Sequence, residues 1–460
     1  MTTLLWLRRD LRRKDLPALG AAHEAAGGNE VYVVFVVDPA LWAKAGAARR
    51  AWLAASVRAT VASYDGNLSI RHGDPRIVIP SLARELGVSS VHATGEPFPY
   101  GRARDRAVAE TLTDDGVTWV ETGSPYAVTP GRVRTREGSP YQVFTPFSRA
   151  WRETGWPEPA EIPAKPCLAP AGDDDRGVTT MLARARSQGP DNLPAAGEEA
   201  ASERWKSFLE ADLAAYVSER DRPAHAGTSR ISPYLKVGAL HPRTLLADLS
   251  SVNSSSAETY TIELCWREFY ADVLWHRPDS AWHDLRQDLS SMTYDESASD
   301  LDAWRGGRTG YPVVDAGMRQ LLATGWMHNR ARMITASFFA KDLHAWWPAG
   351  AKHFLDNLVD GDLASNNHGW QWVAGTGTDA APYFRVFNPV TQGKKFDPKG
   401  DYVRRWVPEL AHLPGNAAHE PWAHDDGYAH GYPRRIVDHA EEREESLARY
   451  HAATRREGTT

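Results

Sequence analysis

The sequence predicts an open parallel α/β domain of Rossmann-like type, followed by a long linker and an all-helical domain. Three observations support this fold class. Strand-like and helix-like patterns alternate through about the first 125 residues. Residues 31–37 (VYVVFVV) form a continuous apolar run, as expected for a parallel strand that is covered on both faces. From about residue 196 onward, the strong patterns are helical.

The alternating part predicts a series of βαβ units, whose ligand should lie beyond the carboxyl ends of the strands. It contains neither G-x-G-x-x-G nor a Walker glycine-lysine pattern, which argues against ordinary dinucleotide or NTP binding. The expected strands are residues 4–7, 31–37, 68–71, 90–93 and 118–121, and the expected helices are residues 15–26, 46–63, 75–86 and 101–113.

The domain boundaries follow from changes in composition. Pro, Ala, Gly and Asp are frequent between residues 129 and 195, which is typical of a linker that runs over the surface. We therefore expect an α/β domain at residues 1–128, an interdomain linker at 129–195 and a helical domain at 196–460. The last periodic pattern, residues 441–455, predicts a charged surface helix.

The overall composition excludes several classes of protein. Hydrophobic residues make up 42% and charged residues 24%, and no stretch approaches the roughly 18 apolar residues of a membrane span. An arginine pair at residues 8–9 follows too few apolar residues for a signal peptide. The two cysteines, Cys167 and Cys265, offer neither a disulfide framework nor a metal quartet. We therefore expect a cytoplasmic protein without a metal site.

The charge is unevenly distributed along the chain. The net charge of −6 argues weakly against a nucleic-acid partner. Residues 305–341, however, contain six Lys or Arg against one acid, and residues 385–405 contain six against two. This pattern fits a protein that binds phosphate groups through one of its surfaces only. Scattered, solvated arginines are the alternative interpretation.

The segment 360–372 (DGDLASNNHGWQW) combines acids, amides and two indoles. On a helix, Asn366 and Trp370 share a face while Trp372 points elsewhere. One amide and one indole could therefore address a bound cofactor. A buried aromatic helix with capping acids is the alternative. Eleven of the 18 tryptophans lie between residues 266 and 422, a density that favours stacking or electron-transfer chemistry.

A second pattern places Glu263, Trp266, Arg267 and Tyr270 on one face of a helix. A carboxyl group, an indole and a guanidinium side by side can hydrogen-bond a base edge, stack on it and hold a phosphate. The alternative is an Arg–Glu pair over a core aromatic residue.

Two further segments carry polar groups in positions from which they could bind a ligand. In residues 325–333, Asn329 and Met333 share a helical face that is flanked by arginines, and methionine suits a flat ligand. In residues 227–233, hydroxyls and backbone N–H groups before a helix could hold a diphosphate. A structural account, with Ser232 as N-cap and Pro233 as the first helical residue, is equally good.

Taken together, five segments in this order and spacing closely resemble the photolyase/cryptochrome family. The resemblance runs from residue 4 to the final helices and misses only the linker. The segments are LLWLRRDLR at 4–12, GTSRISP at 227–233, ELCWREF at 263–269, TGYPVVDAGMR at 309–319 and WMHNRARM at 326–333.

This resemblance implies a helical domain that binds FAD in a bent form, at the bottom of a cavity facing DNA. Asp360 and Asp362 would meet the ribityl and isoalloxazine portions, and Asn366 would face flavin N5. The plant photoreceptor branch resembles this segment with Asp instead, so Asn366 favours a repair enzyme. The residues expected around FAD are Tyr216, Thr228, Ser229, Arg230, Ile231, Ser232, Asn329, Asp360, Gly361, Asp362 and Asn366.

The implied reaction is the light-driven splitting of a cyclobutane pyrimidine dimer that is flipped out of UV-damaged DNA, single- or double-stranded. Glu263 would bond the pyrimidine edge, Trp266 and Trp372 would flank the dimer, and Met333 would line its floor. Relatives specific for the (6-4) photoproduct carry histidines where Asn329 and Met333 stand, which favours the cyclobutane lesion. The expected DNA and lesion contacts are Arg220, Glu263, Trp266, Arg267, Tyr270, Asn329, Arg330, Arg332, Met333, Trp372 and Gln392.

The family also passes electrons from the surface to the flavin along three tryptophans. Trp370 and Trp347 match the inner two, but the outermost position falls at Tyr294. Because a tyrosine donor must shed its phenolic proton, photoreduction could be slower or rerouted through Trp346 or Trp304. The residues expected to act in catalysis are Glu263, Tyr294, Trp347, Asn366 and Trp370.

An antenna chromophore is expected in the α/β domain. Residues 99–105 (PYGRARD), Arg49 and Lys236 resemble the 8-hydroxy-5-deazaflavin branch of the class I enzymes rather than the folate branch, methenyltetrahydrofolate being the alternative. The expected antenna contacts are Arg49, Glu96 and Lys236.

Two competing interpretations are a cryptochrome-type blue-light photoreceptor without repair activity and a generic nucleotide-binding α/β protein with a helical partner domain. Asn366 and the short C-terminus argue against the first, and the missing glycine fingerprints argue against the second. We expect a monomer that acts on DNA, with neither a membrane partner nor an obligate protein partner.

Overall fold

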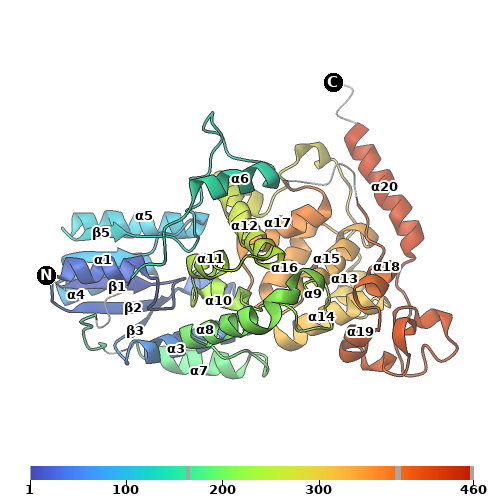
Figure 1. The fold of residues 1–460 in the computed structure, drawn as a ribbon, viewed down its shortest axis with the longest axis horizontal. Helices are drawn as coiled ribbons and strands as arrows, with labels where there is room; N and C mark the ends of the chain where they lie inside the picture. Colours follow the sequence, from blue (N-terminus) through green and yellow to red (C-terminus); the bar gives the residue numbers. More distant parts are fainter. Residues whose placement is uncertain (1, 162–165, 173, 379–384, 456–460) are drawn as a thin grey trace. The chain divides into compact units, whose positions relative to one another are not determined.

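The computed structural model describes residues 2–161, 166–172, 174–378 and 385–455 (Figure 1). The chain divides into two compact units. The first comprises Met1–Ala214, Ser229–Pro278 and Val359–Gly361, and the second comprises Ala215–Thr228, Asp279–Leu358 and Asp362–Thr460. The first unit thus extends past the boundary predicted at residue 195. The division into binding domains at 1–128, 129–195 and 196–460 stays a prediction.

The first unit contains the predicted sheet, and the fold class is confirmed. All neighbouring strands are parallel, in the order β3-β2-β1-β4-β5. The central strand β1 pairs with β2 on one side and β4 on the other, so the strand order reverses beside β1, where open α/β sheets commonly bind ligands. The strands are β1 (Thr3–Leu7), β2 (Val31–Val37), β3 (Ser69–His72), β4 (Ser90–Ala93) and β5 (Thr118–Glu121).

Alternate residues of the sheet bury apolar side chains under the helices. Trp6 and Val34 pack with Ile79 of α4 and Val108 of α5, and helix α1 lies against β1 and β4 (Figure 1). The helices that follow the first four strands are α1 (Pro17–Ala26), α2 (Pro39–Ala43), α3 (Ala47–Ser63), α4 (Pro75–Leu86) and α5 (Pro99–Asp114).

The segment expected to be an interdomain linker, residues 129–195, contains two helices. Helix α6 (Phe144–Thr154) buries Phe144, Phe147 and Trp151, and helix α7 (Val178–Ser187) packs against α3. The composition predicted no helix in this segment, because the Pro- and Gly-rich average concealed the aromatic residues spaced along one face of α6. The other helices of the first unit are α8 (Glu198–Ser207), α10 (Ser232–Val237), α11 (Pro242–Ser250) and α12 (Ser255–His276).

The second unit is helical. Its core is aromatic and includes Trp304, Phe339, Trp347, Phe354 and Trp370, all buried. None of the helices in the described ranges combines the length and apolar character needed to cross a bilayer. The helices are α9 (Tyr216–Glu219), α13 (Ala298–Arg305), α14 (Pro312–Thr324), α15 (Asn329–Ser337), α16 (Trp347–Asn357), α17 (Leu363–Ala374), α18 (Pro389–Phe396), α19 (Asp401–Trp406) and α20 (His439–Arg455).

Candidate functional site

Helix α17 carries the segment with acids, amides and indoles. Asp362 is its N-cap, and the carboxylate accepts a hydrogen bond from Ser365 N at 3.1 Å, which satisfies one of the free N–H groups of the first turn. The side chain of Asn366 donates to Ala351 O at 3.1 Å and to Asn367 Oδ1 at 2.8 Å. Both amide hydrogens are thus held inside the protein, and the carbonyl oxygen is the group that Asn366 can offer to a ligand.

Trp370 lies one helical turn after Asn366 and is buried. Its ring packs edge-on against Phe354, Phe339 and Trp304, with centroid distances of 5.0, 5.5 and 6.1 Å. The indole N–H of Trp370 is buried and has no hydrogen-bond partner among the described residues. An unsatisfied donor and an amide carbonyl one turn apart fit a flavin, whose ring carries several acceptors and N–H groups.

Trp347 is the first residue of α16 and is fully buried. Its indole Nε1 donates to Asp284 Oδ1 at 2.6 Å. Tyr294, half-buried, lies within the electrostatic influence of the same carboxylate, and burial together with Asp284 raises the pKa of its phenol above the ordinary value. The structure therefore identifies Asp284, which was not among the predicted site residues, as the hydrogen-bond partner of Trp347. No periodic pattern marks Asp284, because it lies between helices.

Helix α15 presents the predicted face of Asn329 and Met333, whose Nδ2 and Sδ atoms are 4.0 Å apart. His328 is the N-cap, with Nδ1 accepting from Arg330 N at 3.1 Å. Arg330 is not simply solvated: it donates to Asp221 Oδ1 at 2.8 Å and lies over the Phe396 ring at 4.3 Å.

The remaining predicted residues of the second unit lie on separate elements. Tyr216 of α9 is buried, and the guanidinium of Arg220 lies over its ring at 5.4 Å. Arg332 donates to Met327 O at 2.8 Å. Thr228, Trp372 of α17 and Gln392 of α18 are partly exposed.

In the first unit, the structure joins two residues predicted to meet the cofactor. Ser232 Oγ donates to Asp360 Oδ2 at 2.6 Å. Helix α10 begins at Ser232 with Ile231 as its N-cap, so Ser232 is the first helical residue and its side chain does not cap the helix. The alternative in which Ser232 is the N-cap and Pro233 the first helical residue is therefore wrong.

The residues beside Ser232 and Asp360 differ in burial and in whether their polar groups are already hydrogen-bonded. Ser229 Oγ is 2.7 Å from Tyr260 OH and also accepts from Ile231 N at 3.3 Å, so its hydroxyl is engaged within the unit. Ile231 is buried, and Gly361 is buried directly after Asp360. Arg230 is exposed and has φ +51°, an uncommon conformation for a residue other than glycine.

Helix α12 places its four predicted residues on its partly exposed side. Glu263, Trp266, Arg267 and Tyr270 are all partly exposed, whereas Leu264, Cys265, Glu268 and Phe269 are buried. The Trp266 ring stacks on Phe144 with centroids 3.6 Å apart, and Arg267 lies over the Tyr126 ring at 4.2 Å. The predicted shared face exists, with one face of the Trp266 indole already covered.

Glu268 orients this helix, a role the sequence did not reveal. Its carboxylate accepts from Ala127 N, Val128 N at 2.9 Å and Trp151 Nε1 at 2.6 Å. Burial raises the pKa of Glu268, while these three donors oppose that effect. A buried carboxylate with three donors ties α12 to α6 and to the chain after β5.

The predicted antenna residues are only partly brought together. Glu96 Oε1 is 3.3 Å from Arg9 Nη1, and Leu11 N donates to Val237 O, next to Lys236. The chain after β1 therefore lies beside both Glu96 and the Lys236 segment. Arg49, on α3, donates to Lys44 O at 2.9 Å.

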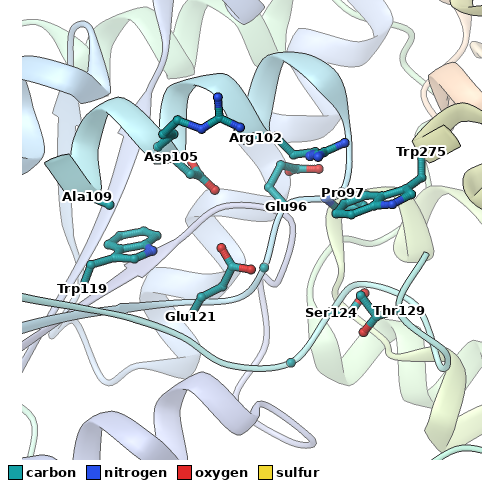
Figure 2. A pocket seen from close by; sticks show the side chains of 13 residues that line it. Glu96, Pro97, Arg102, Asp105, Ala109, Trp119, Glu121, Ser124, Thr129 and Trp275 are labelled. Atoms are coloured by element: carbon teal, nitrogen blue, oxygen red, sulfur yellow. The ribbon is translucent and has the colours of Figure 1, made fainter. Parts of the chain in front are cut away.

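Glu96 also lines a cavity of about 240 Å³ beyond the carboxyl ends of β4 and β5. Figure 2 shows Trp119 and Trp275 on opposite sides of it, with the carboxylates of Glu96, Asp105 and Glu121 between them. Burial raises the pKa of Glu121. A second cavity of about 360 Å³ is lined by residues of the predicted 99–105 motif, including Tyr100 and Arg104, together with Asp38.

Two protein-family models match this chain. A model described as DNA photolyase matches residues 3–166, and a model described as the FAD binding domain of DNA photolyase matches residues 260–452. The deoxyribodipyrimidine photo-lyase of Alkalihalophilus pseudofirmus is 36% identical and aligned over 96% of each chain. The enzyme of that name from Escherichia coli is 38% identical over 98% of this chain and 99% of the relative.

Solved structures are similar over the same length. A bacterial class III photolyase from Agrobacterium tumefaciens has a TM-score of 0.90 at 36% identity, covering 99% of this chain and 98% of that one. A photolyase from Sulfolobus tokodaii with two FAD molecules has a TM-score of 0.83 at 25% identity, covering 98% and 100%. A Synechocystis cryptochrome has a TM-score of 0.82 at 28% identity, covering 97% and 98%. Because these similarities extend over nearly the whole chain, the protein belongs to the photolyase/cryptochrome family.

Proposed function

We propose that this protein is a deoxyribodipyrimidine photo-lyase that uses light to repair cyclobutane pyrimidine dimers in UV-damaged DNA. The observation that carries this function is the similarity, over almost the whole chain, to enzymes of that name at 36% and 38% identity. Bound FAD, in its reduced form, would supply the light-driven electron that splits the cyclobutane ring. The side chains of the protein would hold the flavin and the lesion in position for this electron transfer.

Around the flavin, Asn366 would accept a hydrogen bond through its carbonyl oxygen, because both of its amide hydrogens are bound to Ala351 and Asn367. An acceptor of this kind suits a reduced flavin, whose N5 carries a hydrogen. The Ser232–Asp360 pair would face the more polar portions of the cofactor. The other FAD contacts expected from the sequence stay predictions.

Toward the lesion, Glu263 and Trp266 would act from the partly exposed side of α12, as a hydrogen-bond partner and a stacking surface. Phe144 holds the Trp266 ring from behind, so the indole is positioned before DNA arrives. Met333 would contribute an apolar contact from α15, and Trp372 a second aromatic one from α17. Arg220 and Arg332 would hold the strand through its phosphates.

One experiment tests the proposal. Reduced protein is incubated with an oligonucleotide that contains a thymine dimer, under blue light and in darkness, and restored thymines are quantified by chromatography. We expect restoration in the light only. An oligonucleotide with a (6-4) photoproduct serves as the matched substrate and should remain unchanged. Absence of light-dependent restoration would defeat the repair function and favour a cryptochrome-type photoreceptor.

For the antenna, we retain the class I assignment with 8-hydroxy-5-deazaflavin, held by Arg49, Glu96 and Lys236. Its support is the resemblance of the 99–105 motif and the position of Glu96 beside Arg9. Absorption spectra of protein purified from its own source test this choice. A deazaflavin band is expected, whereas a folate band, or a second equivalent of FAD as in the Sulfolobus tokodaii relative, would overturn it.

For light-driven reduction of oxidised flavin, we propose the route Tyr294–Trp347–Trp370. Trp304 is a less suitable terminal donor, because it is fully buried and its N–H is bound to Thr335 O at 3.0 Å. We also expect the protein to act as a monomer in the cytoplasm, which size-exclusion chromatography and cell fractionation test.

A further inference from the structure

Residues 131–142 (GRVRTREGSPYQ), which we call the arginine loop, join the chain after β5 to helix α6. Figure 1 shows this loop projecting beyond α6. Exposed arginines stand at the alternate positions 132, 134 and 136, and the loop contains one acid, Glu137. This local excess of positive charge attracts anions, although the net charge of the whole chain is negative.

Hydrogen bonds within the arginine loop hold its shape. Thr135 N donates to Ser139 O and Gly138 N donates to Thr135 O, each at 2.9 Å, which forms a tight turn at the tip. Arg134 braces the base against the tip, because its Nε donates to Gly131 O and its Nη1 to Gly138 O, each at 2.9 Å. The guanidinium of Arg134 is therefore engaged within the loop.

The base of the loop is fixed to helix α12. Gly131 N donates to the Asp272 carboxylate at 2.6 Å. Gly131 has φ +88°, and a Cβ added to it would be 2.3 Å from Trp275 Nε1, so only glycine allows this close approach. Just after the loop, Phe144 stacks on Trp266 with centroids 3.6 Å apart and an angle of 5° between the rings. Both ends of the loop thus lie against the helix that carries the predicted lesion contacts.

Arg132 and Arg136 differ from Arg134 in what surrounds their guanidinium groups. Both side chains are exposed, and neither has an ion-pair partner among the residues that the structure describes. Arg152 of α6, by contrast, pairs with Glu258 at 2.5 Å. A guanidinium presents a planar set of donors that matches a phosphate group, and it is more weakly hydrated than an ammonium group. Arg132 and Arg136 can therefore each bind a phosphodiester.

We propose that the arginine loop binds the backbone of the DNA strand next to the lesion, with Arg132 and Arg136 on its phosphates and Arg134 holding the loop in shape. This inference rests on the proposed function, because a lesion stacked on Trp266 brings its flanking strand to the base of the loop. The stack of Phe144 on that indole favours DNA over other polyanions. Phosphate contacts carry no sequence information, so the loop contributes equally to the binding of damaged and undamaged DNA.

Fluorescence anisotropy in darkness, over a salt series, tests the phosphate contacts with oligonucleotides that do or do not contain a thymine dimer. Arg132→Gln/Arg136→Gln should weaken binding of both oligonucleotides about 10-fold at about 0.1 M salt, and should reduce the slope of log affinity against log salt by about two units. The matched control is Arg58→Gln/Arg184→Gln, which removes the same charge from exposed positions on α3 and α7. It should change both affinities by less than about 2-fold, because salt screens distant charges. Unchanged thermal unfolding midpoints show that both variants are folded.

Crosslinking locates the loop on the DNA. Cys167 is exposed and Cys265 is buried, so a Cys167→Ser background leaves no exposed cysteine among the described residues. Ser139→Cys at the tip of the loop, labelled with an azidophenacyl group, should crosslink to nucleotides that flank the dimer on one side. Ser187→Cys, on the last residue of α7, is the control and should give no crosslink.

The inference is overturned if Arg132→Gln/Arg136→Gln binds both oligonucleotides as tightly as the control variant. A loss confined to dimer-containing DNA would also contradict it, since both oligonucleotides have the same phosphates, and so would a crosslink from Ser139→Cys no stronger than that from Ser187→Cys. None of these measurements requires light-driven repair. Wild-type protein that binds DNA through the loop but restores no thymines under blue light would therefore count against the proposed function alone.

Discussion

At the scale of single residues, the side chains around Trp370 have distinct tasks. Phe354, Phe339 and Trp304 surround the indole edge-on and hold its plane. Asn366, one turn earlier, has both amide hydrogens bound and so offers one oxygen in one direction. A redox-active ring and a fixed hydrogen-bond acceptor on one helix can address the same ligand, because residues four apart share a face.

Replacing Trp370 by Phe should separate two activities. Phenylalanine fills the aromatic pocket but is far harder to oxidise than an indole, so photoreduction of oxidised flavin should be lost. Dimer splitting by pre-reduced enzyme should remain close to that of the wild type, because that reaction starts from flavin that is already reduced. Absorption spectroscopy under blue light and the thymine-dimer assay measure the two activities. Loss of both would refute the assignment of Trp370.

The buried histidine of α17 predicts a loss of stability in acid. His368 Nδ1 donates to Ala364 O, and Nε2 accepts from Ser280 Oγ, each at 2.8 Å, an arrangement that requires the neutral ring. Burial lowers the pKa of His368 to about 4 from 6.5. Between these values the unfolded chain binds a proton that the folded chain does not, so stability falls as the pH falls. The loss is about 2 kcal/mol at pH 5 and about 3 kcal/mol by pH 4.

Urea unfolding at pH 7 and pH 5 measures this effect. His368→Gln retains hydrogen-bonding groups but cannot titrate, so its free energy of unfolding should fall less between the two pH values than that of the wild type. His424→Gln, at an exposed histidine, is the control and should follow the wild-type curve. An identical pH dependence for His368→Gln and wild type would contradict the prediction.

At the scale of elements, the contact between α16 and α17 decides where Trp370 lies. Gly350 of α16 faces the indole so closely that a Cβ added there would be 2.3 Å from Trp370 Cη2. This glycine is needed for close approach, since a methyl group has no room. Helix α16 also begins at Trp347, so the same packing contact sets the relation between the two inner tryptophans.

Gly350→Ala should therefore destabilise the protein by ~1–3 kcal/mol, because the indole or the helix must move. The matched control is Gly369→Ala on α17, where a Cβ meets nothing within 4 Å. That change should be neutral or stabilising by up to ~1 kcal/mol, through reduced backbone freedom of the unfolded chain. Thermal unfolding followed by circular dichroism distinguishes the two. Equal effects of the two substitutions would show that Gly350 does not form a tight contact.

At the scale of the whole molecule, the charge pattern concerns DNA. The net charge is −6. Arg330, which is expected to bind a DNA phosphate, is held in position by a hydrogen bond to Asp221 and by contact with the Phe396 ring. A carboxylate beside such an arginine reduces the local positive potential. DNA affinity should therefore fall as the salt concentration rises. It should also depend on the opposing charges of Arg330, which attracts phosphate, and Asp221, which repels it.

Asp221→Asn should strengthen binding of damaged and undamaged DNA alike at low salt, because it removes a negative charge near the strand. Arg330→Gln should weaken both and reduce the slope of log affinity against log salt by about one unit. Fluorescence anisotropy across a salt series measures both. A change confined to damaged DNA would place Arg330 at the lesion rather than at the phosphates.

Much of the fold could be predicted from local patterns. The five strands, and β2 in particular, follow from apolar runs between turn residues, and the strands are parallel as expected. The helices in the predicted linker were missed because an average composition hid the aromatic spacing of α6. The shared face of α12 and the N-cap of α17 were predictable because both depend on residues close in sequence.

The fold class, the family and the helical faces could therefore be predicted from the residues alone, since they depend on periodicity and on ordered motifs. Three contacts depend on the folded chain: Ser232 donates to Asp360, Phe144 covers one face of Trp266, and Trp347 donates to Asp284. These contacts link residues separated by tens to more than a hundred positions. Their geometry is set by how helices pack and where loops are anchored, and no local pattern encodes that information.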